Sequence, residues 1–208
     1  REMYLSKIRN FYDSELIKVI TGIRRCGKSV LMNQIIEEIK QNNVDDEHII
    51  YINFEDYDFI DYTEPHKFNN YIKEKIIDEK KYYLFFDEIQ NVNEFERVIN
   101  SFRATMNVSI FITGSNSKLL SGELATLLTG RFISIKMMPF TYSEFIELKK
   151  SKNQEINENT FYEYIEWGGM PLIYNSNNDV DRKMYLRDLY DAIILKDIVE
   201  RNNIKDIN

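Results

Sequence analysis

The chain has 208 residues, of which 43% are hydrophobic and 29% are charged, and it carries a net charge of −7. This composition is that of a globular protein and argues against a disordered chain or a broadly basic nucleic-acid-binding surface. No apolar run approaches the roughly 18 residues that a membrane-spanning helix needs. One cysteine cannot form an internal disulfide, which favours a cytoplasmic location. Because the sequence begins with Arg1 and not with methionine, we expect it to be a piece of a longer protein.

Short β-prone runs alternate with amphipathic helical patterns after a helical lead-in at 1–15, which predicts a doubly wound parallel α/β sheet. From residue 139 onward only helical patterns remain, so we expect an α/β nucleotide-binding domain over 1–138 and a small helical lid over 139–208. The predicted strands are 16–21, 48–54, 82–86, 108–112 and 132–135. The predicted helices are 29–40, 65–80 (with Phe68, Tyr71, Ile72, Ile76 and Ile77 inward), 94–106, 117–129, 141–150, 158–167 and 179–201.

Two glycines separated by four residues and followed by Lys-Ser predict a phosphate-binding loop between the first strand and the first long helix. Glycines allow positive φ, and successive backbone N–H groups at a helix N-terminus favour an anion. Lys28 would reach the β- and γ-phosphates, and the Ser29 hydroxyl would ligate Mg²⁺. The candidate nucleotide-binding residues are Gly22, Ile23, Arg24, Arg25, Cys26, Gly27, Lys28, Ser29 and Val30.

Asp87 and Glu88 end the most apolar predicted strand. A carboxylate at the end of a buried strand is costly without a cation or hydrogen-bond donors nearby. We therefore assign Asp87 to Mg²⁺ and Glu88 to orienting or deprotonating the attacking water. The alternatives are a helix cap for Asp87 and an ordinary surface carboxylate for Glu88.

The fourth predicted strand runs into Thr113-Gly114-Ser115-Asn116, where a polar side chain would sense the γ-phosphate or position the water. Asn116 and Ser115 are the candidates, and Thr113 is a weaker one. A Ser-Asn pair at a strand end is also a common helix N-cap. Arg131 follows Gly130 and could act as an arginine finger on another subunit's phosphate, or could pair with a local carboxylate.

These segments together resemble the AAA+ P-loop ATPases, and in particular a prokaryotic subgroup of AAA-domain ATP-binding proteins. The resemblance covers nearly the whole chain and rests on 21–29, 87–92, 113–121, 128–131 and 167–171 (Trp-Gly-Gly-Met-Pro, where the subgroup has Tyr-Gly-Gly-x-Pro). It implies a sheet order 5-1-4-3-2, ATP and Mg²⁺ as ligands, and the finger role for Arg131. Residues 197–201 resemble the point at which a C-terminal domain of unknown function normally begins, so that domain is expected to be absent here. The lid departs from the family pattern, since neither Arg182 nor Arg187 stands out as a second sensor arginine.

The sequence thus predicts a Mg²⁺-dependent AAA+ ATPase domain that binds ATP and ADP, with a possible homo-oligomer sharing its active site. One alternative is a nucleotide-gated switch that hydrolyses ATP negligibly without a partner or the missing domain. Another is a P-loop kinase, which the Asp-Glu pair disfavours. Neither a membrane nor a nucleic-acid partner is supported by this piece.

Overall fold

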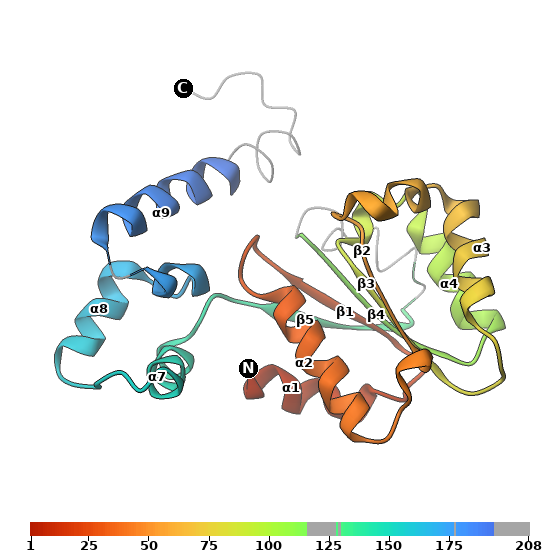
Figure 1. Ribbon diagram of the computed structural model, residues 1–208, viewed down its shortest axis with the longest axis horizontal. Helices are drawn as coiled ribbons and strands as arrows, with labels where there is room; N and C mark the ends of the chain where they lie inside the picture. Colours follow the sequence, from red (N-terminus) through yellow and green to blue (C-terminus); the bar gives the residue numbers. More distant parts are fainter. Residues whose placement is uncertain (116–127, 129, 177, 194–208) are drawn as a thin grey trace. The chain divides into compact units, whose positions relative to one another are not determined.

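The computed structural model describes residues 1–115, 128, 130–176 and 178–193. These residues form two compact units (Figure 1). An α/β unit contains residues 1–22 and 28–136, and a helical unit contains residues 23–27 together with those described from 137 onward. No helix of the described residues is long and apolar enough to cross a membrane.

The α/β unit is built on a five-stranded parallel sheet with the order β2-β3-β4-β1-β5 (Figure 1). Read from β5, this is the order 5-1-4-3-2 that the resemblance implied, and the expectation is confirmed. Every residue of β1 and β3 is buried, as expected for central strands covered on both faces. The strands are β1 (Ile17–Gly22), β2 (Ile49–Asn53), β3 (Tyr82–Asp87), β4 (Val108–Ser115) and β5 (Phe132–Met137).

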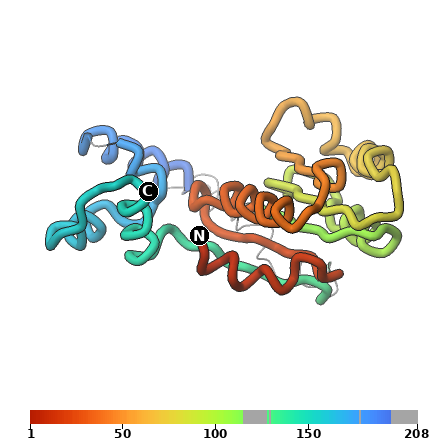
Figure 2. The backbone as a smooth tube through the Cα atoms, turned by 60° about the horizontal axis from the view of Figure 1, so that its bottom comes forward, coloured from red at the N-terminus to blue at the C-terminus, as the bar shows by residue number. Residues whose placement is uncertain are grey.

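Helices cover both faces of this sheet. On one face, alternate strand residues such as Phe86 and Ile112 pack against α3 (Pro65–Lys75) and α4 (Phe95–Thr105) in a continuous apolar core. On the other face lies α2 (Lys28–Gln41), which contacts β1 and β4, with α1 (Glu2–Ile8) beside it (Figure 2). Short 3-10 helices connect these elements: η1 (Arg9–Phe11), η2 (Asp46–His48), η3 (Tyr57–Thr63) and η4 (Ile89–Asn91).

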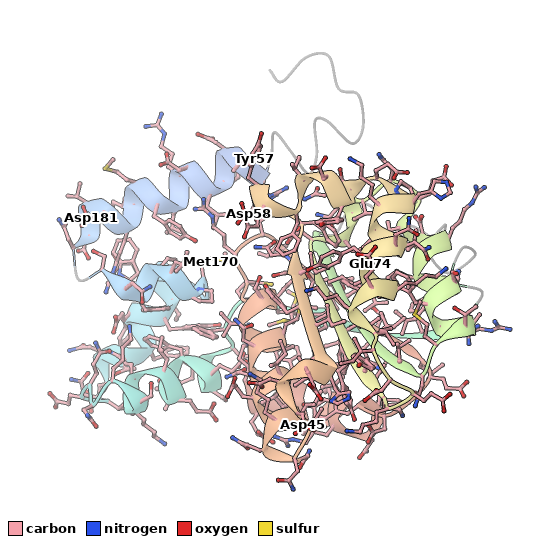
Figure 3. The ribbon with its side chains drawn as sticks, turned by 45° about the vertical axis from the view of Figure 1, so that its right-hand side comes forward. Asp45, Tyr57, Asp58, Glu74, Met170 and Asp181 are labelled. Atoms are coloured by element: carbon pink, nitrogen blue, oxygen red, sulfur yellow. The ribbon has the colours of Figure 1, made fainter. Side chains whose placement is uncertain are left out.

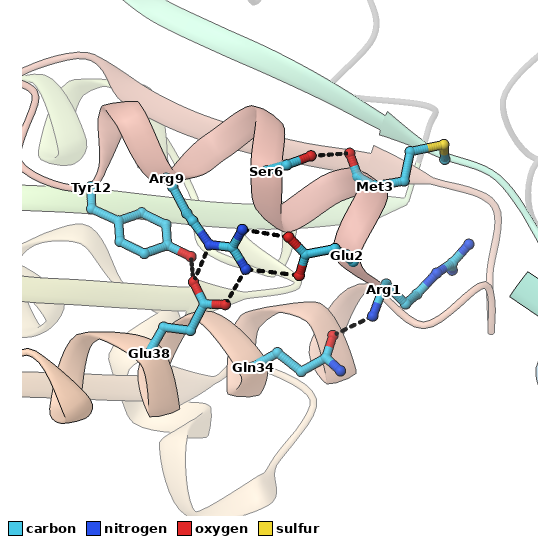
Figure 4. Close-up of polar contacts among 8 residues, drawn as sticks. All are labelled: Arg1, Glu2, Met3, Ser6, Arg9, Tyr12, Gln34 and Glu38. Carbon is cyan, nitrogen blue, oxygen red and sulfur yellow. Dashed lines mark hydrogen bonds and ion pairs between the residues drawn. The ribbon is translucent and has the colours of Figure 1, made fainter. Parts of the chain in front are cut away.

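The lead-in is fixed to α2 by a charged cluster around Arg9. Its guanidinium donates to Glu38 at 2.6 and 2.9 Å and also bonds to Glu2, and Tyr12 donates to Glu38 at 2.8 Å (Figure 4). Exposed ion pairs contribute about 0–1 kcal/mol each, so the apolar face of α1, including the fully buried Ile8, supplies most of the packing.

The prediction for residues 65–80 is wrong at its C-terminal end, because α3 stops at Lys75. The next residue, Ile76, is extended, and the N–H of Ile77 donates to the hydroxyl of Tyr82 at 3.1 Å. The side chain of Ile77 is therefore 71% exposed and not inward. The predicted helix 117–129 lies outside the described residues, apart from Leu128, as does the last part of the predicted helix 179–201.

The helical unit contains α7 (Tyr142–Ser151), α8 (Asn159–Trp167), η5 (Pro171–Asn175) and α9 (Asp179–Ile193). A capping box starts α7, since Thr141 and Glu144 each bond to the other's backbone N–H. The apolar core of the helical unit contains Phe145, Trp167, Met170 (labelled in Figure 3), Ile173, Tyr174 and Leu189.

The Gly168-Gly169 turn after α8 has a geometric cause. Gly168 has φ +74°, a left-handed conformation that side chains disfavour. A Cβ on Gly169 would lie 2.1 Å from the carbonyl oxygen of Phe140, whose N–H donates to the Gly169 carbonyl at 2.7 Å. Two successive glycines are therefore needed where this turn meets the start of the helical unit.

Candidate active site

The carboxyl ends of three adjacent strands bring the predicted site residues of the α/β unit to one edge of the sheet. β4 lies between β1 and β3, and its Thr113 is level with Ile20 of β1. On β3, Phe86 pairs with Ile112, so Asp87 is level with Thr113 on the same face of the sheet. Ligands of parallel sheets bind at such an edge.

The segment from Gly22 to Lys28 has the backbone of a tight strand-to-helix loop. Gly27 has φ +101°, and Arg25 also has positive φ, at +62°. The Cys26 N–H donates to the Ile23 carbonyl at 3.3 Å. The first helical residue is Lys28, one residue before the predicted start at Ser29.

The middle of this loop, residues 23–27, belongs to the helical unit and contacts other residues of that unit. Ile23 packs against the apolar core of that unit, and the Arg25 guanidinium lies 5.4 Å from the ring centroid of Tyr185 on α9. The side chain of Cys26 is fully buried. These contacts could not be read from the motif, because they depend on how the helices after residue 137 fold.

Lys28 is the cation of the site. Its side chain is only 5% exposed, and Nζ donates to the Gly22 carbonyl at 3.3 Å. Nζ also lies 3.4 Å from Oε1 of Glu88. The two residues that the sequence assigned to phosphate binding and to water activation are therefore in direct contact.

Asp87 is buried at the end of β3 and accepts two hydroxyl hydrogen bonds. Thr113 donates to Oδ1, and Tyr51 donates to Oδ2 at 3.1 Å. Burial, and then the negative charge of Asp87, raise the pKa of Tyr51, so its hydroxyl keeps its proton and remains a donor. Sequence reasoning missed Tyr51. Asn53 of β2 pairs with Asp87, and Tyr51, two residues earlier, lies on the same face of the sheet. Only the register of β2 and β3 reveals this, and a single sequence does not contain it.

Glu88 adopts a left-handed conformation, with φ +51° and ψ +47°. This conformation costs a residue other than glycine about 1–2 kcal/mol. Its N–H donates to the Thr113 hydroxyl at 3.1 Å, and its Oε2 accepts a hydrogen bond from the side-chain amide of Gln90. Strained backbone held by several contacts is typical of functional sites.

Thr113, the weakest of the three sensor candidates, thus contacts both acidic residues. Ser115 ends β4 level with Gly22, while Asn116 lies outside the described residues. Arg131 is exposed just before β5, and its backbone carbonyl accepts from Ile17 N–H at 3.0 Å.

The oxygen donors at this edge suit Mg²⁺, which prefers hard oxygen ligands and keeps several waters. Ser29 and Val30 are exposed in the first turn of α2, and Ser29 supplies a hydroxyl there. Each carboxylate oxygen of Asp87 has a second lone pair beyond the bond it accepts. The side chains present therefore fit coordination by Ser29 and coordination through water by Asp87.

Arg182 is held by contacts within the helical unit. It is 9% exposed and its Nε donates to the Ser176 carbonyl at 2.9 Å. Its guanidinium lies 5.3 Å from the ring centroid of Trp167 and 3.7 Å from Glu163. Arg187, the other sensor candidate, is exposed on α9.

Comparisons with known proteins agree with this fold. The family model described as "AAA domain" matches residues 14–146. An uncharacterized protein of Haemophilus influenzae is 38% identical over 99% of this chain, and uncharacterized protein MJ1544 of Methanocaldococcus jannaschii is 35% identical over 92%. The chain covers 52% and 44% of these relatives, about half their length.

Solved structures share the fold at low sequence identity. The Aeropyrum pernix ORC1 protein, solved in complex with DNA, aligns with all of this chain and 62% of its own, with a TM-score of 0.55 and 12% identity. Domain III of the Thermotoga maritima replication initiation protein DnaA aligns with all of this chain and 86% of its own, with a TM-score of 0.52 and 17% identity.

Proposed function

The chain belongs to the AAA domain family, and on that premise we propose that it binds ATP and hydrolyses it with Mg²⁺. The observation that supports hydrolysis most directly is the contact network at the edge of the sheet. Lys28 contacts Glu88, and Thr113 contacts both Glu88 and Asp87. A cation beside one carboxylate, and a second carboxylate held by a hydroxyl that also fixes the backbone of the first, are groups that phosphoryl transfer to water needs.

In the proposed mechanism, Lys28 and the loop amides bind the polyphosphate. Glu88 orients a water and accepts its proton while the water oxygen bonds to the γ-phosphorus, and the bond to the β-phosphate bridging oxygen breaks to release ADP. Lys28 stabilises the negative charge on the transferring phosphoryl group. Ser29, and Asp87 through water, would hold Mg²⁺, which when bound would neutralise charge on the phosphate oxygens.

The test is ATP turnover and ATP affinity measured with purified wild-type protein, Lys28→Met and Glu88→Gln. We expect Lys28→Met to lose binding, and Glu88→Gln to retain binding while turnover falls by about 10²–10⁴-fold, the usual value of a general base. Lys40→Met and Glu37→Gln are matched controls, since both residues lie elsewhere on α2. Absence of ATP binding to the wild-type protein would refute the proposal.

Tight, Lys28-dependent binding without turnover would instead identify a nucleotide-gated switch. In that case the contact of Lys28 with Glu88 would keep Glu88 away from the attacking water.

We also propose that Arg131 acts on the phosphate of a neighbouring copy, supported by its exposed side chain. A mixing experiment tests this. If each site uses Glu88 from one subunit and Arg131 from the next, Glu88→Gln and Arg131→Ala proteins are each inactive alone. Mixing them forms some sites with both residues intact, so turnover reappears. Turnover that stays absent in the mixture, or an active Arg131→Ala protein, would contradict a shared site.

A further inference from the structure

Two donors contact the carboxylate of Glu88, and only one of them is expected to bind phosphate as well. Lys28 Nζ is 3.4 Å from Oε1, and the Gln90 side-chain amide donates to Oε2. Under the proposed function Lys28 is drawn to the incoming phosphate, whose negative charge exceeds that of one carboxylate. Gln90 carries no charge and is not drawn to the phosphate in this way.

The backbone around Gln90 is firmly placed, although η4 is only one turn long. The Asn91 N–H donates to the Glu88 carbonyl at 3.1 Å, and the Asn91 side chain donates to the Phe54 carbonyl at 3.2 Å. On the other side of Gln90, Ile89 is fully buried in the core beneath α3 and α4. Gln90 is therefore anchored through both of its neighbours, and its amide has a defined position beside Glu88.

Fold stability does not account for an amide at this position. Gln90 Oε1 is buried and accepts no hydrogen bond from the described residues. A buried acceptor without a donor is unfavourable, and an apolar side chain of the same length would avoid that cost. The feature that does account for glutamine is its Nε2 contact with Glu88.

We propose that Gln90 is a positioning residue that keeps the Glu88 carboxylate aimed at the attacking water once Lys28 has moved to the phosphate. This role rests on the proposed ATP hydrolysis. Without Gln90, a nucleotide-bound site would leave Glu88 without the donor that fixes its second oxygen. The carboxylate would then sample other rotamers, and a misplacement of about 1 Å can cost roughly 100-fold in rate.

The experiment compares wild-type protein with Gln90→Met and with the control Gln41→Met, which changes an exposed glutamine at the end of α2. We expect Gln90→Met to lower kcat by about 10- to 100-fold, with KM for ATP and ATP affinity changed by less than about threefold. Its melting temperature should stay close to that of the wild type, because removal of the orphaned oxygen offsets the lost hydrogen bond to Glu88. Gln41→Met should match the wild type in every measurement.

Two results would overturn the role of Gln90. They are an unchanged kcat in Gln90→Met and a loss of kcat matched by a fall in melting temperature. Each is obtained against a wild-type protein that hydrolyses ATP, and so each refutes this inference alone. A wild-type protein that binds ATP without turning it over refutes the proposed hydrolysis, and this role with it.

Discussion

Lys18 is a fully buried lysine in the middle of β1, the strand that leads to the phosphate-binding loop. Its ammonium donates to the Ser109 hydroxyl at 2.7 Å and to the Ser14 carbonyl at 3.0 Å, and it lies 4.6 Å from the ring centroid of Phe111. Burial lowers the pKa of Lys18 from its usual 10.5 to about 7. The positive charge of Lys81 acts in the same direction, while Asp13 opposes it.

This pKa predicts how stability varies with pH. Between pH 7 and 10.5 the unfolded chain holds a proton on Lys18 that the folded protein has released, so the unfolded state binds more protons. The free energy of unfolding therefore rises with pH, by about 1.4 kcal/mol per pH unit and by about 5 kcal/mol across the whole interval. This stability is present above pH 10.5 and is lost as the pH falls through 7.

Lys18→Met removes the titration while keeping the length of the side chain. We expect the variant to be more stable than the wild type near pH 7.5, and this advantage to shrink by about 3 kcal/mol at pH 9.5. The assay is urea unfolding followed by far-UV circular dichroism, because the single tryptophan, Trp167, reports only on the helical unit. Lys40→Met, at a surface ion pair, is the control and should keep the wild-type slope. A difference between Lys18→Met and wild type that stays constant from pH 7.5 to 9.5 would refute the reasoning.

Three further predictions concern the two units separately. Thr113→Val should lower turnover by more than about tenfold and the free energy of unfolding by about 1–3 kcal/mol, because it leaves the N–H of Glu88 without an acceptor and removes a donor from Asp87. An unchanged kcat and an unchanged urea midpoint would contradict this. Tyr51→Phe should reduce the Mg²⁺ concentration for half-maximal turnover by roughly fivefold. It removes a hydrogen bond worth about 1 kcal/mol that competes with Mg²⁺ and its waters for the negative charge of Asp87. An unchanged or increased Mg²⁺ requirement would count against it. Arg182→Met should destabilise the helical unit by about 2 kcal/mol, because it loses the contacts of Arg182 with Ser176 and Trp167. Tryptophan fluorescence measures this loss, and ATP affinity should be unaltered. A stable variant with weakened ATP binding would indicate a sensor role.

Much of the fold could be predicted because its signals are local. The apolar run before Asp87 and the periodic helix after Ser29 identify their elements without any tertiary information. The order of the strands could not be obtained in this way and came only from the family resemblance. The end of α3 was missed because its cause is distant: the hydroxyl of Tyr82, on the next strand, takes the N–H of Ile77.

The site follows the same division. Lys28, Asp87 and Glu88 are specified by motifs, and two of them are in contact. The contacts of Tyr51 and Thr113 with Asp87 depend on the register of three strands, which no single segment contains. Thr113 was the weaker sensor candidate in the sequence, and its contacts with Asp87 and with the N–H of Glu88 appear only once the strands are paired. Asn116 lies outside the described residues and stays a prediction.

The left-handed turn at Glu88 explains how two adjacent acidic residues can serve one site. In a continuing strand, successive side chains point to opposite faces, and Glu88 would be directed away from the face that carries Asp87 and Thr113. At Glu88 the backbone leaves the strand, its N–H is taken by Thr113, and its carboxylate reaches Lys28 on α2. The contacts with Lys28, Thr113 and Gln90 together offset the cost of the conformation, which is why the strain can persist there. A glycine at position 88 would relax the backbone but remove the carboxylate, so the strain is the consequence of placing a functional side chain at the end of β3.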